Sequence, residues 1–270
     1  MFSLFAVYHL FEMHILPVRT PLLTAGDDLA VIIAKVVTMH DGDIIVVSSK
    51  AVATVEGALI DLQKIRPTDE ARKWATKCGQ TPEFRQAVLD ETERMHGTIV
   101  GSCPFAMFTS LQPDGFGGGS LLCANAGMDL SNVEAGHAIG WPKDPVASVR
   151  RIHDRLQASG EWRVAVIMTD SCCMPARIGV VAFALTICGI DPLFSRIGEH
   201  DLFGKTMRVT KEAVADQLAT AANFVMGNSD QSTPAAVIRD HGIAMNDFCG
   251  WVGGIRPEED LFGEMMQLRR

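Results

Sequence analysis

Two short segments carry the residues that are best suited to hold a metal ion. In the first, residues 125–132, Asp129 stands among two amides, a hydroxyl and a glycine. The second is Thr169-Asp170-Ser171, which directly follows an apolar stretch. Hard cations such as Mg²⁺ take oxygen ligands and need only one or two carboxylates, because they keep several waters. Each segment alone is more typical of a helix cap or a turn, but two such carboxylates together could clamp a transferring phosphoryl group.

Three further segments bear on phosphate or nucleotide binding. Ser49-Lys50 follows the apolar run 44–47, and a lysine at the end of a buried strand suits phosphate, although a solvated lysine explains it equally well. Met226-Gly227-Asn228 is, by itself, more typical of a glycine helix cap and a polar loop. The glycine-rich run 115–119 has no helix signal after it, so an ordinary loop is expected. The sequence contains no Walker A motif and no Gly-x-Gly-x-x-Gly motif after a strand.

The seven cysteines are odd in number and irregularly spaced, and none forms a Cys-x-x-Cys pair. This pattern indicates neither a disulfide framework nor a structural zinc site. Reduced, mostly buried thiols in a cytoplasmic protein are therefore expected. Cys172 follows Asp170 closely, so a thiol hydrolase is an alternative if a histidine approaches it in space.

The composition indicates a soluble globular protein. The 270 residues are 47% hydrophobic and 21% charged, which suffices for a substantial core. The net charge of -8 and the lack of a basic stripe exclude nucleic acid as an expected partner. The apolar run at residues 1–16 has no preceding basic residue and is too short to span a bilayer. Neither membrane association nor a signal peptide is expected.

Apolar periodicity and turn residues predict helices and strands that do not alternate strictly. Helices are expected after residues 28, 68, 81, 144 and 210, with a surface helix over 257–268. Strands are expected over 44–47, 55–62, 105–111, 121–124, 163–168, 179–188 and 234–238, with 55–62 pairing with 44–47 and 163–168 ending at Asp170. This order favours an α+β fold with mixed and antiparallel sheets and flanking helices.

In order and spacing, the motifs resemble the coenzyme F-420-0:L-glutamate ligase family, also called γ-glutamyl ligases. The resemblance spans residues 17–240 and leaves 1–16 as an N-terminal extension, either not native or poorly ordered, and 241–270 as a C-terminal tail. The segments that carry it are 25–29, 41–43, 46–50, 56–57, 123–132, 169–171, 177–181, 201–204, 209–210, 214–216 and 226–227.

The resemblance implies an enzyme that joins L-glutamate to a deazaflavin precursor by a γ-linked amide. It implies GTP as co-substrate, Mg²⁺ or Mn²⁺, an acyl-phosphate intermediate, two intimately packed subdomains and a homodimer. By the family pattern, the metal ligands are Asp129, Asp170 and Ser171. The residues that contact the nucleotide are then Pro21, Leu22, Ser49, Lys50, Asn132, Met226, Gly227 and Asn228.

The sequence departs from the family pattern at several positions. Thr54 replaces a frequent second lysine, and Asn228 stands where a carboxylate often follows Met-Gly. Residues 172–174 replace a common Gly-Arg pair. Two alternatives therefore stay open: the same chemistry on a different acid and amine, or a nucleotide- or cofactor-binding homologue without turnover.

Overall fold

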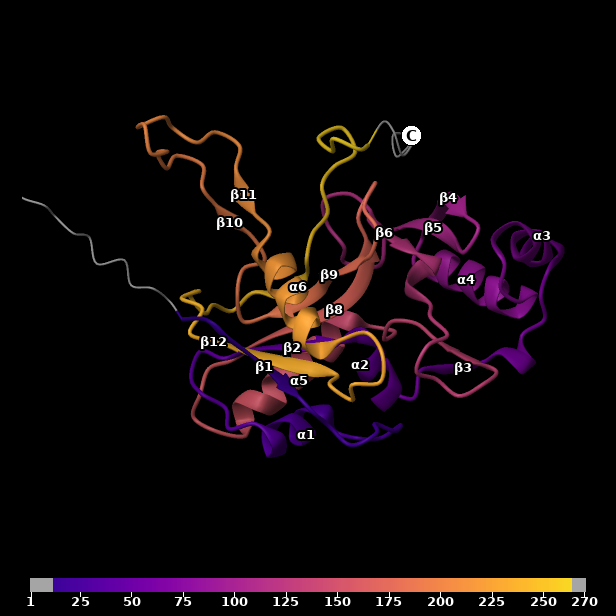
Figure 1. Cartoon of the computed structure of the whole chain (residues 1–270), viewed down its shortest axis with the longest axis horizontal. Coiled ribbons are helices and arrows are strands. Elements are labelled where there is room, and N and C mark those ends of the chain that lie inside the picture. Colours follow the sequence, from indigo (N-terminus) through magenta and orange to yellow (C-terminus); the bar gives the residue numbers. More distant parts are fainter. Residues whose placement is uncertain (1–11, 264–270) are drawn as a thin grey trace, which may run out of the picture.

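A six-stranded mixed sheet forms the centre of the structure (Figure 1). The computed structural model describes residues 12–263. The strand order is β1-β12-β2-β8-β9-β13, in which β2 and β8 are parallel and all other neighbours are antiparallel. The strands are β1 (His14–Val18), β2 (Ile44–Ser48), β8 (Ala165–Cys173), β9 (Val180–Cys188), β12 (Ala235–Arg239) and β13 (Cys249–Trp251).

Helices cover both faces of this sheet. Figure 1 shows α6 (Val214–Met226) above it and α1 (Leu29–Val36) and α5 (Pro145–Ala158) below it. In β2, Ile44 and Val46 pack in the cluster with α6, whereas Ile45 and Val47 pack in the cluster with α1 and α5. Because both faces are buried, the central strands are continuous apolar runs rather than alternating ones.

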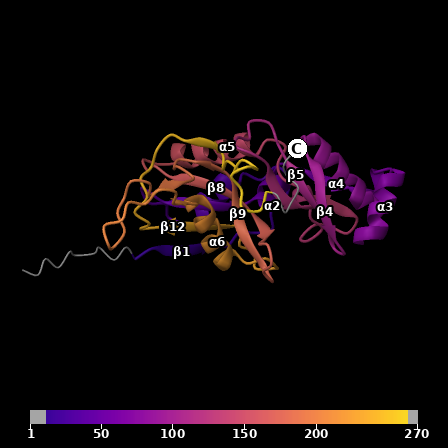
Figure 2. The same cartoon turned by 90° about the horizontal axis from the view of Figure 1, so that it is seen from above.

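A smaller lobe lies to one side of the sheet, as Figures 1 and 2 show. Two helices and two short sheets build it. Thr68 and Thr81 cap its two helices, as the sequence predicts, and each hydroxyl accepts a backbone N–H three residues on. The elements are α3 (Asp69–Cys78), α4 (Pro82–Arg94), the pair β3 (Leu59–Asp61) and β7 (His137–Ile139), and the sheet β4 (Thr98–Cys103), β5 (Ala106–Leu111) and β6 (Leu121–Ala124). The predicted α+β class is confirmed.

A long arm projects from the main sheet (Figure 1). Its two strands, β10 (Phe194–Ser195) and β11 (Lys211–Glu212), pair at the base, and an isolated antiparallel bridge joins His200 to Thr206 nearer the tip. The chain reverses at residues 201–205, where Leu202 and Phe203 are 99% and 96% exposed. The tip of the arm therefore presents two adjacent large apolar side chains to solvent.

Some predicted elements differ in the structure. The chain after β2 turns directly into α2 (Ser49–Val55), which carries it away from the sheet, so β3 pairs with β7 and not with β2. Thr210 does not cap α6, because β11 intervenes and the helix begins after Ala213 without a side-chain cap. Asp170 lies within β8 rather than at its end, because β9 continues the ladder as far as Cys173.

The described fold also extends beyond residues 17–240. β1 begins at His14 and pairs with β12, so the sheet includes part of the predicted N-terminal extension. β13 lies in the predicted C-terminal tail and forms the other edge of the sheet. The prediction of a surface helix over residues 257–268 is wrong as far as Gly263, because residues 257–263 form turns and not a helix. The rest of the predicted helix lies outside the described residues. Most of the extension, residues 1–11, also lies outside them.

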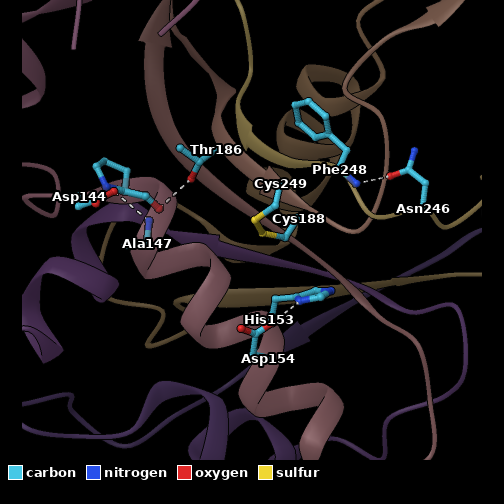
Figure 3. Close-up of a disulfide and its surroundings, with 10 residues drawn as sticks. Asp144, Ala147, His153, Asp154, Thr186, Cys188, Asn246, Phe248 and Cys249 are labelled. Atoms are coloured by element: carbon cyan, nitrogen blue, oxygen red, sulfur yellow. Dashed lines mark hydrogen bonds and ion pairs between the residues drawn. A yellow bond between two sulfur atoms is a disulfide. The ribbon is translucent and has the colours of Figure 1, made fainter. Parts of the chain in front are cut away.

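The expectation that all cysteines are reduced is wrong for one pair. Cys188 and Cys249 form a disulfide between β9 and β13 (Figure 3). The two residues are directly opposed in the antiparallel register, and their Cα atoms are 4.0 Å apart. Sequence spacing could not reveal this pair, because 61 positions separate the two cysteines.

Candidate active site

A cavity of about 360 Å³ opens beside the ends of β2 and α6. β2 and β8 are parallel with Ser48 opposite Thr169, so the residues that follow these two positions meet at one edge of the sheet. Ten of the eleven predicted site residues line the cavity: Pro21, Leu22, Lys50, Asp129, Asn132, Asp170, Ser171, Met226, Gly227 and Asn228. Ser49 does not, because its side chain is buried at the start of α2.

The Asp129 carboxylate is held by a dense set of donors. Lys50 forms an ion pair with its Oδ2, and the Ser131 hydroxyl donates to the same oxygen at 2.6 Å. The backbone N–H groups of Leu130 and Ser131 donate to Oδ1 at 2.6 and 3.0 Å. Partial burial raises the pKa of Asp129, but the hydrogen bonds from Lys50 and Ser131 outweigh it and bring the pKa below its ordinary value. Asp129 is therefore ionised at neutral pH.

A left-handed turn carries the chain into Asp129. Asn125, Ala126 and Gly127 have φ values of 51°, 53° and 74°, a conformation that asparagine and glycine tolerate but that is costly for alanine. The fully buried Arg85 supports the turn by donating to Asn125 Oδ1 at 2.8 Å. The surrounding structure thus determines a backbone geometry that local preferences disfavour.

Asp170 lies deeper in the site than Asp129. Its Oδ2 accepts the indole N–H of Trp141 at 2.6 Å, and its Oδ1 accepts the N–H of Ser171 at 2.8 Å. Burial raises the pKa of Asp170 to about 6, and the negative charge of Asp129 adds to this rise while Lys50 opposes it. The two carboxylates and the lysine thus form one electrostatically coupled group.

Two polar loops meet across the cavity. Gly227 directly follows α6 and caps its C-terminus, and its φ of 76° suits a glycine. Beyond it, Asn228 Oδ1 accepts the Ser171 hydroxyl at 3.1 Å, and Ser229 O accepts the Asn132 amide at 3.0 Å. The segment that follows α6 therefore contacts both segments that carry the candidate metal ligands, through Ser171 and Asn132.

The donor set fits a hard divalent cation. The carboxylates of Asp129 and Asp170, the Ser171 hydroxyl and the amide oxygen of Asn228 all offer oxygen atoms, which such cations prefer. Within residues 12–263, no group of three or more His, Cys, Asp or Glu side chains is placed to hold a metal ion. A cation with two carboxylates plus water or phosphate ligands, such as Mg²⁺, matches this arrangement better than zinc.

Two other sequence candidates are not supported as site residues. Burial raises the pKa of the Cys172 thiol to about 11, and no histidine of the described residues lines the cavity beside it. A reactive cysteine needs a lowered pKa and a nearby base, so the thiol hydrolase is not favoured. The glycine-rich loop packs on the segment after β13, where a Cβ at Gly118 or Gly119 would collide with backbone oxygens of Gly254 and Ile255.

The structure adds site residues that the sequence reasoning did not include. Ser131 lies in the segment 125–132 that carries Asp129, but the sequence does not single it out as a site residue. Thr54 is noted in the sequence only as the residue that stands in place of a frequent second lysine. Trp141 gave no signal, because the partner of its indole lies 29 positions away. The cavity is also lined by Thr20, Leu23, Ser48, Ala51, Thr54, Ser131, Thr169, Val180, Asn223 and residues 229–234.

Comparison with known proteins decides the family. The model of the F420-0:gamma-glutamyl ligase family matches residues 17–240. The chain belongs to this family. It is 37% identical over 248 residues to the coenzyme F420:L-glutamate ligase of Methanothermobacter thermautotrophicus, covering 88% of this chain and 91% of the relative. The protein of the same name from Archaeoglobus fulgidus is 37% identical over 86% of this chain and 90% of its own length.

The ligase of Methanocaldococcus jannaschii, also a coenzyme F420:L-glutamate ligase, is 36% identical over 93% of this chain and 97% of its own length. The predicted family is therefore confirmed, together with its class of enzyme, a ligase that forms carbon–nitrogen bonds. Among the described residues, no helix is both long and apolar enough to cross a membrane.

Proposed function

We propose that this γ-glutamyl ligase family member uses GTP and Mg²⁺ or Mn²⁺ to add L-glutamate to a deazaflavin coenzyme of the F420 type. One observation carries the proposal: Lys50, Asp129 and Asp170 form one charged cluster in a cavity lined by the predicted nucleotide residues. The near full-length similarity to proteins named coenzyme F420:L-glutamate ligase supports the acceptor and the amino acid.

The proposed reaction proceeds through an acyl phosphate. A carboxylate oxygen of the acceptor attacks the γ-phosphorus of GTP, and GDP leaves. The glutamate amine then attacks the carbonyl carbon, loses a proton and expels inorganic phosphate. A bound divalent cation supplies positive charge to the phosphate oxygens in this chemistry.

The residues of the chain act by binding and by charge. Asp129, Asp170 and Ser171 would hold the cation, and Asn228 would supply a neutral amide oxygen beside them. Lys50 neutralises phosphate charge, because its ammonium group lines the cavity beside Asp129. Pro21, Leu22, Asn132, Met226 and Gly227 surround the nucleotide. No covalent nucleophile is required.

As part of the same proposal, we infer that the protein forms a homodimer and is located in the cytoplasm. The apolar tip of the arm supports the dimer, because Leu202 and Phe203 are almost fully exposed in the single chain. A second copy of this chain is the proposed partner of that tip.

The decisive test is mass spectrometry of the products formed from deazaflavin precursor, glutamate, GTP and Mn²⁺. We expect the acceptor to gain glutamate by an amide bond, with phosphate released only when glutamate is present. Phosphate release with another acid or amine, and none with these substrates, would identify a different acceptor. Stabilisation by GTP without any product would instead identify a binding homologue.

A further inference from the structure

We propose that Trp141 is a positioning residue that fixes the Asp170 carboxylate and the Asp129 turn relative to each other. This inference rests on the proposed role of both carboxylates as metal ligands. Trp141 is 3% exposed and does not line the cavity, so it acts through Asp170 and not on a substrate.

The indole N–H determines the orientation of Asp170. It donates to Oδ2 at 2.6 Å. The indole is a donor only, so this hydrogen bond has one direction. Because Ser171 N donates to Oδ1, each carboxylate oxygen has one protein donor and keeps a lone pair for a cation.

Tight packing fixes the indole ring itself. The backbone of Gly127 lies so close to the ring that a Cβ at this position would collide with it. On the Asp170 side, Phe183 contacts the ring edge-on, with centroids 6.4 Å apart. Gly127 lies two residues before Asp129, so the Trp141 ring contacts the turn that leads to Asp129. The same indole donates its N–H to Asp170.

The chain just before Trp141 adds a further link. Ile139 and Asp129 exchange backbone hydrogen bonds of 2.8 and 3.0 Å. The segment from β7 to Trp141 therefore holds the backbone of Asp129 through Ile139 and the side chain of Asp170 through the indole. Such an arrangement of hydrogen bonds around ligands is what tunes metal affinity.

The alternative is that Trp141 only fills the core. Trp141→Phe separates the two explanations, because it keeps an aromatic body but removes the N–H. Mn²⁺ affinity is measured directly from the electron paramagnetic resonance signal of the free ion. We expect Trp141→Phe to bind Mn²⁺ roughly 10–100-fold more weakly.

Trp162→Phe is the matched control. Trp162 also donates its indole N–H, at 3.2 Å, but to the Leu156 carbonyl at the end of α5. This variant is expected to bind Mn²⁺ like the unaltered protein. Equal affinity in Trp141→Phe and Trp162→Phe, with both folded, would overturn the positioning role.

A second measurement needs no variant at position 141. In protein labelled with ¹⁵N-tryptophan, Mn²⁺ should broaden the indole N–H resonance of Trp141 but not that of Trp162. That resonance is assigned by elimination with phenylalanine variants of the other three tryptophans. An unbroadened Trp141 signal at saturating Mn²⁺ would contradict the inference.

Asp170→Asn separates this inference from the proposed function. If Asp170→Asn loses Mn²⁺ binding while Trp141→Phe keeps it, only the role of Trp141 fails. If the unaltered protein binds no Mn²⁺, the proposed metal site fails and the role of Trp141 fails with it.

Discussion

At the residue scale, the two carboxylates differ because their donors differ. Asp129 has a lysine, a hydroxyl and two backbone N–H groups, and its pKa lies below the ordinary value. Asp170 has an indole and one backbone N–H in a more buried position, and its pKa rises to about 6. The site therefore contains one carboxylate that is firmly ionised and one that titrates close to neutrality.

Asp129→Asn should lower turnover by at least about 100-fold, because it removes a negatively charged ligand of the proposed cation, whose positive charge stabilises the transferring phosphate. The fold should persist, because the Asp129 side chain is 47% exposed and such ion pairs contribute only about 0–1 kcal/mol. Glutamate-dependent phosphate release and thermal unfolding check both parts. Asp114→Asn, at an almost fully exposed carboxylate, is the control. Full activity in Asp129→Asn would show that the metal assignment is wrong.

Mn²⁺ binding should depend on pH through Asp170. A raised pKa means that the carboxyl is protonated below about pH 6, and a proton competes with the cation for its oxygens. Affinity should therefore be constant well above this pH and fall up to about tenfold per pH unit below it. Titrations with Mn²⁺ across this range measure the profile. A loss that begins only near the ordinary carboxyl pKa of 3.8 would contradict the assignment.

At the scale of elements, a few interactions hold β13 in its place at the edge of the sheet. It is a three-residue edge strand, and the disulfide joins it to β9. Trp251 in β13 in turn donates its indole N–H to the Asp114 carbonyl at 3.0 Å and packs edge-on against Phe116. The disulfide thus secures the strand that holds the glycine-rich loop of the smaller lobe.

Reducing this disulfide should lower the melting temperature. Closing a loop of 61 residues restricts the unfolded chain and contributes about 4 kcal/mol in the loop-entropy model. For a chain of this size, that corresponds to a melting temperature lower by about 10 °C. Scanning calorimetry with and without a phosphine reductant measures the change, and the Cys188→Ser, Cys249→Ser double variant should not respond. An unchanged melting temperature would support the original expectation of reduced thiols.

At the scale of the whole molecule, the arm carries two large apolar side chains, Leu202 and Phe203, that no other part of the described chain buries. The β10–β11 pair at the base and a bridge between His200 and Thr206 join its two legs, while its apolar tip is exposed. A tip of this kind favours association with another surface over a solvated end. A dimer of this chain would bury it.

If the chain forms the proposed dimer, replacing both Leu202 and Phe203 by glutamate should therefore convert that dimer to a monomer. Buried charges without partners oppose an interface strongly. Light scattering coupled to size-exclusion chromatography gives the mass of the species. Leu261→Glu, at another side chain that is 88% exposed, is the matched control and should stay dimeric. A monomeric unaltered protein would refute the proposed dimer.

Local signals in the sequence determined most of the elements. The caps Asp28, Thr68 and Thr81 determined three helix starts, because their side chains bond backbone groups within three positions. Apolar runs determined β2 and β9, because strands buried on both faces require them. The ordered series of motifs also determined the family, from residues 25–227 alone.

Only the tertiary structure determined the contacts between residues that lie far apart in the sequence. It brought Lys50 to Asp129 and Trp141 to Asp170, and it joined Cys188 to Cys249. These partners lie 29 to 79 positions apart, so no local pattern records them. Asp129 and Asp170 were identified as residues by the sequence, but their pKa values and their shared cavity follow from burial and neighbours, which exist only once the chain is folded.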